Sequence, residues 1–343
     1  MPTRRQTLAA GLSLGVLASR LADAASTYQP PPALVEAARK EGRMVLYTTL
    51  YTEVEQEVIN VFNKTFPFVK VEMVRAPGGQ MITRVQTEAA AGKLIADLID
   101  HSDASQMAAL SAMFVDYQPP NATDYLPSTI AAGKFWPTIT PAWGIAYNTE
   151  LVKNPPRTWR DLCDTKYKPG EIGMVIAGSG GSTFGRIMFE RMVLGEDYWA
   201  AQAATKPKLY PSGAPLGDAI VRGEVLLGAV ILNAVYASQK DGAPVAVVFP
   251  PEGIPVVFNS AGIPKTAAHP NAARLFLDWK LSLEGQIDAI KERGMLTSLK
   301  DIPAEPKGFN SKAVKIWVPD FIGKAALREP WTADWNKIYG YRQ

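Results

Sequence analysis

The 343-residue sequence has very few residues that bind metals or form covalent cross-links. It contains one cysteine, Cys163, and two histidines, His101 and His269. A single cysteine excludes an intramolecular disulfide, a cysteine-rich zinc knuckle and an iron–sulfur cluster held by cysteines of this chain. The histidines lie far apart without a His-x-x-x-His motif, which argues against a zinc-hydrolase site. The fold must therefore be stabilised by packing.

The sequence also lacks an excess of charge of either sign. It has 36 Lys and Arg against 33 Asp and Glu, which gives a formal net charge of +3. A protein dedicated to nucleic-acid binding concentrates a basic excess on one face, so no nucleic-acid partner is predicted. The hydrophobic share of 47% is ordinary for a globular protein. At roughly 150 residues per domain, the length predicts about two globular units.

Long hydrophobic runs are absent as well, since no apolar run approaches the roughly 20 residues of a membrane-spanning helix. The apolar run at residues 8–18 follows Arg4-Arg5 and precedes Ala22-Asp23-Ala24. This order is typical of a removable signal peptide, predicted to comprise residues 1–24 and to send the mature protein to the periplasm. The paired arginines favour a twin-arginine signal, with an ordinary secretory signal as the alternative.

Apolar strands alternate with amphipathic helices along the chain. Strands are predicted at residues 44–47, 69–74, 96–100, 173–177 and 226–232, each followed by a polar turn. This alternation predicts parallel sheets flanked by helices, and ligands on such sheets bind beyond the carboxyl ends of the strands. The polar turns are therefore where a binding site is expected.

Further elements are predicted outside these units. The sequence indicates helices at residues 32–42 and from residue 270 onward, and strands at 144–148, 244–249 and 256–259. The last of these is interpreted as a strand that returns to the first half of the molecule.

Three motifs in the middle of the chain resemble a family of transport proteins. These are Tyr147-Asn148-Thr149, residues 158–162 (TWRDL) and residues 166–173 (KYKPGEIG). They are similar to a run in periplasmic solute-binding proteins of ABC importers, in the subgroup that includes ferric-iron, phosphonate and thiamine binders. Residues 46–49 and 269–273 look like further landmarks of this family, and the resemblance covers nearly the whole mature chain.

The resemblance implies an α/β fold of the two-lobed type II periplasmic-binding-protein kind. Each lobe would be a mostly parallel sheet flanked by helices, and two crossover strands would act as a hinge. The implied boundaries are 25–142 plus 257–300 for the first lobe and 143–256 for the second. Residues 301–343 would form a helical tail that packs on the lobes.

The implied role is solute capture rather than catalysis. A monomer without a cofactor would bind a small polar solute and deliver it to an ABC permease driven by an ATPase subunit. A small anion is the expected ligand class, namely a phosphonate, an organic phosphate or a carboxylate.

Most candidate ligand-binding residues follow from the physics of the polar turns, and Tyr236 is implied by the resemblance to ferric-iron members of the family. A turn that opens a helix presents unpaired N–H groups with a partial positive charge, which favours an anion. Capping is the alternative role for each Ser or Thr in such a turn, and a surface salt bridge is the alternative for Arg75. The predicted residues are Thr48, Thr49, Tyr51, Arg75, Gly78, Gly79 and Ser102 in the first lobe, and Ser179, Gly180, Gly181, Ser182, Thr183, Asn233 and Tyr236 in the second.

Two other functions remain open from the sequence. The resemblance implies an NxYY motif at residues 233–236 in ferric-iron members of the family, but here Val235 replaces the first tyrosine. Iron would therefore have to be held by Tyr236 and Tyr51. A serine hydrolase would use Ser179 in a turn that is close to a nucleophile elbow, with His269 as the base. The first glycine of that motif is absent, so hydrolysis is the remoter alternative.

Two tryptophans near the first crossover, Trp136 and Trp143, are predicted either to stack on a ring of the ligand or to pack in the core.

Overall fold

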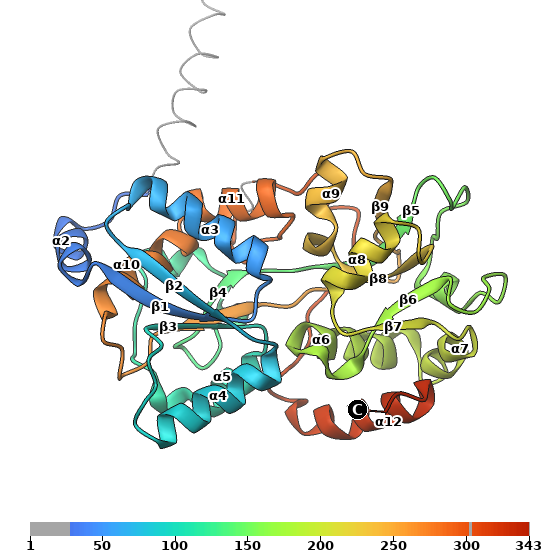
Figure 1. The fold of residues 1–343 in the computed structure, drawn as a ribbon, viewed down its shortest axis with the longest axis horizontal. Coiled ribbons are helices and arrows are strands. Elements are labelled where there is room, and N and C mark those ends of the chain that lie inside the picture. Colours follow the sequence, from blue (N-terminus) through green and yellow to red (C-terminus); the bar gives the residue numbers. More distant parts are fainter. Residues whose placement is uncertain (1–27, 302–303, 343) are drawn as a thin grey trace, which may run out of the picture.

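A computed structural model describes residues 28–301 and 304–342 of the chain. These residues form two α/β lobes that lie side by side, with the C-terminal helix beneath the second lobe (Figure 1). The predicted signal peptide lies outside the described residues. Within the described ranges, no helix is both long enough and apolar enough to cross a membrane.

Lobe 1 is built on a five-stranded sheet with strand order β2-β1-β3-β11-β4. β1, β2 and β3 are parallel, whereas β11 runs antiparallel to both β3 and β4. The strands are β1 (Arg43–Thr48), β2 (Lys70–Arg75), β3 (Leu98–His101), β4 (Trp136–Ile139) and β11 (Asn259–Gly262), and the helices are α2 (Pro32–Glu41), α3 (Thr52–Thr65), α4 (Gly78–Ala90), α5 (Ala104–Ala109), α10 (Pro270–Leu281) and α11 (Leu283–Arg293).

Lobe 2 repeats this plan with strand order β7-β6-β8-β5-β9. β7, β6 and β8 are parallel, and β5 is antiparallel to β8 and β9. The strands are β5 (Trp143–Asn148), β6 (Ile172–Val175), β7 (Lys208–Tyr210), β8 (Leu227–Ile231) and β9 (Val245–Val248), and the helices are α6 (Gly181–Phe189), α7 (Tyr198–Ala204), α8 (Gly213–Val221), α9 (Tyr236–Lys240) and α12 (Arg328–Tyr339). This two-sheet α/β architecture is the fold class predicted from the sequence.

Short segments connect the lobes and are hydrogen-bonded to one another. Residues 140–142 lead from β4 to β5, and residues 249–258 lead back from β9 to β11. The amide of Val257 donates to the Pro141 carbonyl at 3.0 Å and so joins the two crossings. The first crossing is also held by Leu296, which follows α11 and donates its amide to the Thr140 carbonyl at 2.9 Å. The second crossing also contains β10 (Ile254–Pro255), which pairs with β12 (Ile316–Trp317) of the tail.

Local sequence signals explain how the first elements begin and end. α2 begins with Pro32, whose fixed φ suits the first turn of a helix. It ends at Gly42, which has a φ of +67° and donates its amide to the Ala38 carbonyl. Only glycine adopts this left-handed conformation without strain, so the chain can turn directly into β1.

Aromatic side chains fill the two cores. In lobe 1, Phe62 of α3 meets Phe276 and Trp279 of α10, with ring centroids 4.9 and 5.6 Å apart. In lobe 2, Trp159 and Phe189 pack at 5.6 Å. Such pairs bring a large apolar area out of water, which compensates for the lack of covalent cross-links.

The chain differs from the sequence-based expectation at the return crossing. The strand predicted at residues 256–259 begins at Asn259 as β11, and β10 precedes it at residues 254–255. The apolar residues between these two strands, 256–258, are buried. The amide of Val256 donates to the Trp317 carbonyl of the tail and that of Val257 to the Pro141 carbonyl of the other crossing, so the segment does not continue β11. A hydrophobic run alone does not distinguish such a buried crossing from a strand.

Candidate functional site

The carboxyl ends of strands from both lobes face a small cavity of about 50 Å³. Small-molecule sites commonly measure about 300 to 1,000 Å³. The cavity is small because side chains and glycine backbone of the two lobes meet across it. Its lining consists of Thr49, Leu50, Tyr51, Arg75, Pro77, Gly78, Ser102, Pro141, Trp143, Ser179, Gly180, Ser182, Thr183, Ser212, Gly213, Ile231 and Asn259.

Three helices present their first turns to this cavity. Gly78 is the first residue of α4 in lobe 1, Ser182 and Thr183 lie in the first turn of α6, and Gly213 begins α8 in lobe 2. The first N–H groups of a helix have no partner within it and carry a partial positive charge. Helix ends from both lobes therefore make the cavity favourable for an anion.

Arg75 and Tyr51 add a fixed charge and a hydroxyl from lobe 1. Arg75, the last residue of β2, donates from Nε to the Leu50 carbonyl at 3.4 Å. Burial raises the pKa of Tyr51 to about 12, although Arg75 and the backbone amides of Gly213 and Ala214 favour the ionised form. Tyr51 is therefore a neutral phenol that faces the beginning of α8 in the opposite lobe.

Glycines allow the two lobes to approach at backbone distance. A Cβ atom on Gly181 would lie 2.3 Å from the carbonyl oxygen of Ser102, and one on Gly78 would lie 3.7 Å from the Cα of Gly180. A larger residue at position 181 would force the lobes apart, whatever the solute.

A buried histidine supports the α4 end of the cavity. His101 is fully buried, its Nε2 lies 3.0 Å from the Gly78 carbonyl, and its Nδ1 accepts from the Asp103 amide at 3.0 Å. These partners fix the neutral tautomer with the proton on Nε2. Burial lowers the pKa of His101 to about 4, and the positive charge of Arg328 acts in the same direction.

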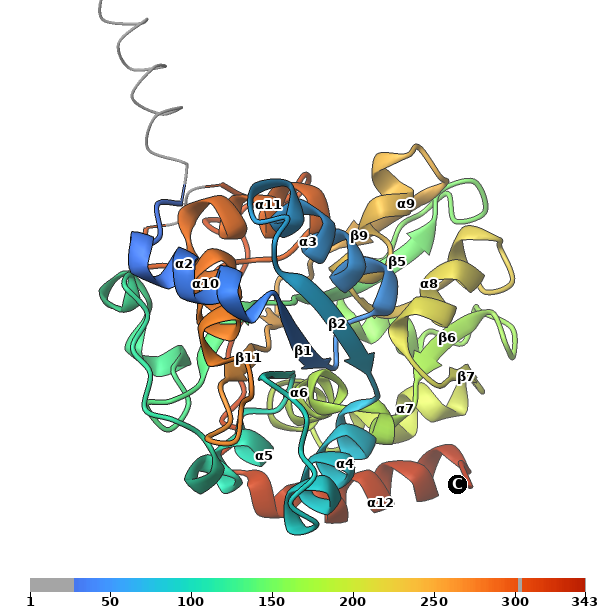
Figure 2. The ribbon, with the colours of Figure 1, turned by 60° about the vertical axis from the view of Figure 1, so that its left-hand side comes forward.

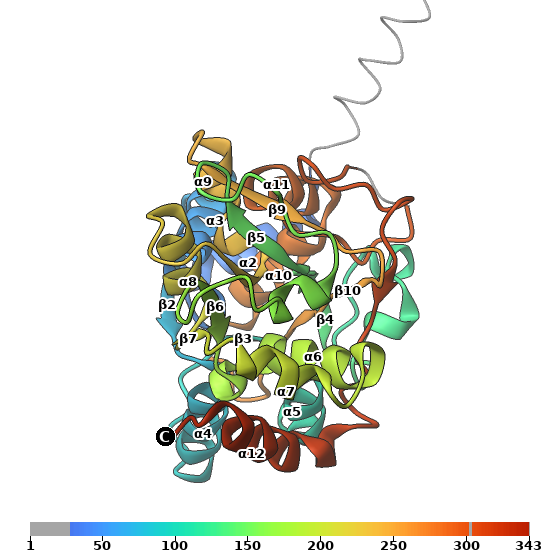
Figure 3. The same cartoon turned by 90° about the vertical axis from the view of Figure 1, so that its right-hand side faces the viewer.

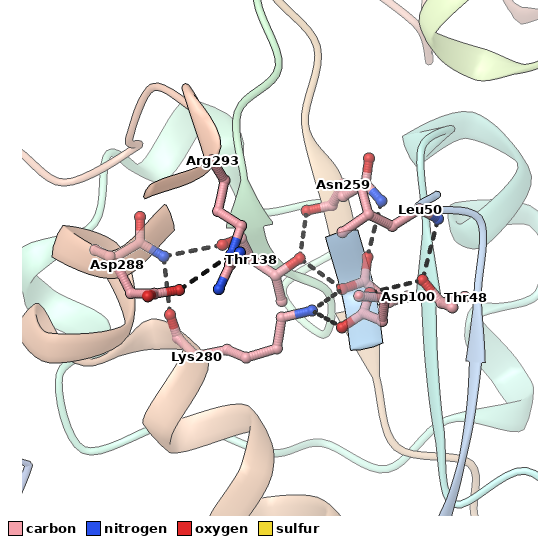
Figure 4. A network of polar contacts seen from close by, with 10 residues as sticks. Thr48, Leu50, Asp100, Thr138, Asn259, Lys280, Asp288 and Arg293 are labelled. Atoms are coloured by element: carbon pink, nitrogen blue, oxygen red, sulfur yellow. Dashed lines mark hydrogen bonds and ion pairs between the residues drawn. The ribbon is translucent and has the colours of Figure 1, made fainter. Parts of the chain in front are cut away.

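Beneath the cavity, lobe 1 holds a charged network that is almost inaccessible to water (Figure 4). Lys280 of α10 contacts Glu55 of α3 at 3.0 Å and Asp100 of β3 at 2.9 Å. Burial alone would lower the pKa of Lys280, but Asp100 and Glu55 raise it above its ordinary value. Two carboxylates and one ammonium group are thus buried together.

The network also fixes two segments that line the cavity. Asp100 accepts from Nδ2 of Asn259 at 3.2 Å, and Asn259 lines the cavity at the start of β11. Glu55 accepts from the Thr48 hydroxyl at 2.9 Å, whose oxygen accepts from the Leu50 amide at 3.1 Å. The positions of Leu50 and Asn259 therefore depend on the same buried charges.

The structure brings most of the predicted site residues together. Nine of them, Thr49, Tyr51, Arg75, Gly78, Ser102, Ser179, Gly180, Ser182 and Thr183, line the cavity.

Five predicted site residues are not part of the lining. Thr48 is buried against Glu55, and Gly79 and Gly181 line a neighbouring crevice beside α12. Asn233 is buried just after β8, and Tyr236 uses its hydroxyl to contact the Lys291 carbonyl and the Lys307 amide, both at 3.2 Å.

The tryptophan and histidine candidates from the sequence also divide into residues that line the cavity and residues that do not. Trp143 lines the cavity, whereas Trp136 donates to the Tyr117 carbonyl in lobe 1. His269 lies 2.9 Å from Asp97 and is not part of the lining that contains Ser179, so the hydrolase alternative gains no support.

The sequence reasoning missed several lining residues, most clearly Ser212 and Gly213. A usable signal was present, because a short apolar strand, a serine and two small residues precede Pro215 in the first turn of a helix. Asn259 was missed as a site residue because its position depends on the return crossing.

Among residues 28–301 and 304–342, no group of three or more His, Cys, Asp or Glu side chains is arranged to hold a metal ion.

A family comparison agrees with this geometry. The model of the bacterial extracellular solute-binding proteins matches residues 46–287, which is more than half of the chain. The chain belongs to the bacterial extracellular solute-binding protein family. The resemblance recognised from the sequence motifs is confirmed at this level.

Among curated proteins, this solute-binding protein is 29% identical over 208 residues to an uncharacterised protein of Haemophilus influenzae. The match covers 56% of the present chain and spans about 60% of the length of that relative.

Solved structures show the same fold. One is the periplasmic binding protein AfuA from Actinobacillus pleuropneumoniae with fructose-6-phosphate bound, with a TM-score of 0.75, 24% identity, and coverage of 88% of this chain and 100% of that one. Another is iron-bound HitA from Pseudomonas aeruginosa, with a TM-score of 0.71, 18% identity, and coverage of 85% and 99%. The type II periplasmic-binding-protein fold is therefore established.

The buried histidine predicts a pH-dependent stability. Because the pKa of His101 falls from 6.5 to about 4 on folding, its contribution is present above pH 6.5 and lost as the pH falls toward 4. Between pH 7 and pH 4.5, the free energy of unfolding measured in urea should fall by about 2 kcal/mol more in the wild type than in His101→Gln. Burial raises the pKa of Asp278 to about 6, which favours the folded state as the pH falls. This effect is the same in the wild type and in His101→Gln, so the difference between the two proteins reports on His101. Parallel pH profiles for the two proteins would contradict this role.

The buried charge network predicts a large stability effect at Lys280. Lys280→Met leaves Glu55 and Asp100 buried without their cation, so unfolding should need about 3–5 kcal/mol less free energy. Lys40→Met is the matched control, because Lys40 pairs with Glu36 on the exposed surface and should lose at most about 1 kcal/mol. Equal unfolding midpoints for the two variants in urea would refute the assignment.

Proposed function

We propose that this protein is the periplasmic substrate-binding component of an ABC importer that captures a small anionic solute. The solute classes are those whose negative oxygens suit backbone N–H groups and a guanidinium, namely organic phosphates, phosphonates and carboxylates. The protein makes and breaks no bond. It passes the solute to a permease driven by a separate ATPase subunit.

One observation carries the proposal: α4, α6 and α8 from both lobes direct their first turns at one cavity that also contains Arg75. A solute anion held at this point contacts both lobes at once. Its binding free energy is then larger with the lobes together than with the lobes apart, and this difference drives closure. The fold likeness to AfuA, a protein solved with fructose-6-phosphate, supports the organic-phosphate class.

The size of the cavity limits what the present arrangement can hold. At about 50 Å³ it is smaller than a sugar phosphate requires. A solute of that size would hold the lobes further apart than they stand here. Rotation at the crossings, residues 140–142 and 249–258, can supply this change without altering either sheet.

Ferric iron is the competing ligand. Of the two tyrosines that would have to hold it, Tyr51 lines the cavity and Tyr236 does not. The Tyr236 hydroxyl already contacts the Lys291 carbonyl and the Lys307 amide. Iron binding would therefore require a rearrangement around Tyr236, which makes an organic anion the better fit.

A ligand screen tests the proposed function. Mature protein freed of solute by unfolding and refolding would be heated with fructose 6-phosphate, phosphonates, small carboxylates, thiamine or ferric citrate. An anion at 100 times its dissociation constant should add about 2.7 kcal/mol of stability and raise the melting temperature. Stabilisation by ferric citrate alone, with a visible tyrosinate-to-iron absorption band, would replace the anion proposal with the iron alternative.

Arg75 provides a test of the site itself. Arg75→Ala removes the guanidinium from the cavity, so affinity for the anion found in the screen should fall at least tenfold by calorimetry. Lys70→Ala is the matched control, since Lys70 lies at the exposed opposite end of the same strand and should bind normally. Unchanged affinity in Arg75→Ala would remove this residue from the site.

A further inference from the structure

The C-terminal helix α12 is fixed on lobe 2 but places a charge on lobe 1. Trp331 meets Trp199 of α7 edge to face, and Trp335 is fully buried, so α12 packs beneath α6 and α7 (Figure 3). Arg328, the first residue of this helix, forms an ion pair with Asp103 of lobe 1. Figure 2 shows α12 passing beside α4 and toward α5, the helix that follows Asp103.

Both members of this pair are held in place by their own lobe. One oxygen of Asp103 caps α5 by accepting from the amides of Ser105 and Gln106 at 3.0 and 3.2 Å. The guanidinium carbon of Arg328 lies 4.1 Å from the centroid of the Phe184 ring, which belongs to α6. The ion pair therefore joins two rigid bodies rather than two flexible side chains.

Burial makes the pair sensitive to closure. The Asp103 side chain is 0% exposed and that of Arg328 is 22% exposed. The pair adjoins the contact between Gly181 and Ser102, where the lobes touch at backbone distance. Opening the lobes would separate the two charges and admit water to both.

We propose that the Asp103–Arg328 pair is a latch that stabilises the closed lobes without a bound solute. In the closed form the Asp103 carboxylate has lost its water: one oxygen is held by the α5 amides, and the other faces the guanidinium from the other lobe. A buried ion pair contributes little net free energy compared with apolar packing, but removing one partner leaves an uncompensated buried charge. Loss of Arg328 alone should therefore penalise the closed form and not the open one.

A disulfide across the lobe contact measures this closure without any solute. In a Cys163→Ser background, Gly78→Cys and Gly180→Cys place thiols where the lobes meet, because a Cβ on Gly78 would lie 3.7 Å from the Gly180 Cα. The protein is brought to equilibrium with a glutathione buffer, and the ratio of disulfide to free thiols gives the effective concentration of one thiol at the other. This effective concentration is proportional to the population of closed protein, even when that population is small. No solute is added, so failure of the anion screen does not affect the result.

Adding Arg328→Met to this parent should lower the effective concentration at least tenfold, and Asp103→Asn, which keeps a good helix cap, should lower it as well. The double variant Asp103→Asn with Arg328→Met should recover most of the loss, because no buried charge is left unpaired. Lys337→Met removes a charge from an exposed position of the same helix and should leave the value unchanged.

An effective concentration within twofold of the parent in both single variants would overturn the latch. A loss in the double variant as large as in Arg328→Met would also overturn it, because the effect would then come from packing of the arginine side chain. Unfolding midpoints in urea, measured for every variant, confirm that the thiols are compared in folded protein.

Discussion

The buried ammonium group of Lys280 is the interaction on which the arrangement of lobe 1 depends. It lies between Glu55 and Asp100, which are brought together from a helix and a strand more than 40 residues apart in sequence. Such a cluster is stable only when every charge has a close partner, because each ion has lost its water. The requirement fixes α10 against α3 and β3. It also sets the position of Asn259, where the return crossing enters the lobe.

This network buries two carboxylates with one ammonium group, yet it adjoins the cavity in which we propose that an anion binds. Hydrogen bonds reduce the conflict, because hydroxyls of Thr48 and Thr138 and the amide of Asn259 donate to the carboxylates. On the cavity side, Arg75 and the first turns of three helices present positive charge. At short range in a medium from which water is partly excluded, the groups that touch the solute contribute most to its binding.

Much of the fold could be predicted from the sequence because it depends on local signals. The pattern of apolar residues predicted the strands around residues 46, 71 and 174. The polar turn that follows each strand indicated where the cleft lies. Nine predicted residues share one cavity for that reason. Asn259 could not be found in this way, because it reaches the cavity through a crossing whose register depends on partners more than 100 residues away. Tyr236 failed to reach the cavity for a related reason, since its hydroxyl bonds to segments that follow α10.

The closed arrangement depends on small residues as much as on attractive ones. Gly181 allows α6 to touch the Ser102 backbone, where any Cβ would lie within 2.3 Å of an oxygen. This contact brings the beginning of α6 to the lobe boundary, next to the Asp103–Arg328 pair. Shape therefore determines how near the lobes can come, and charge determines how favourable that position is. The Asp103–Arg328 pair lies at this same boundary, next to Ser102, so it connects the tail helix to the contact that sets how near the lobes can come.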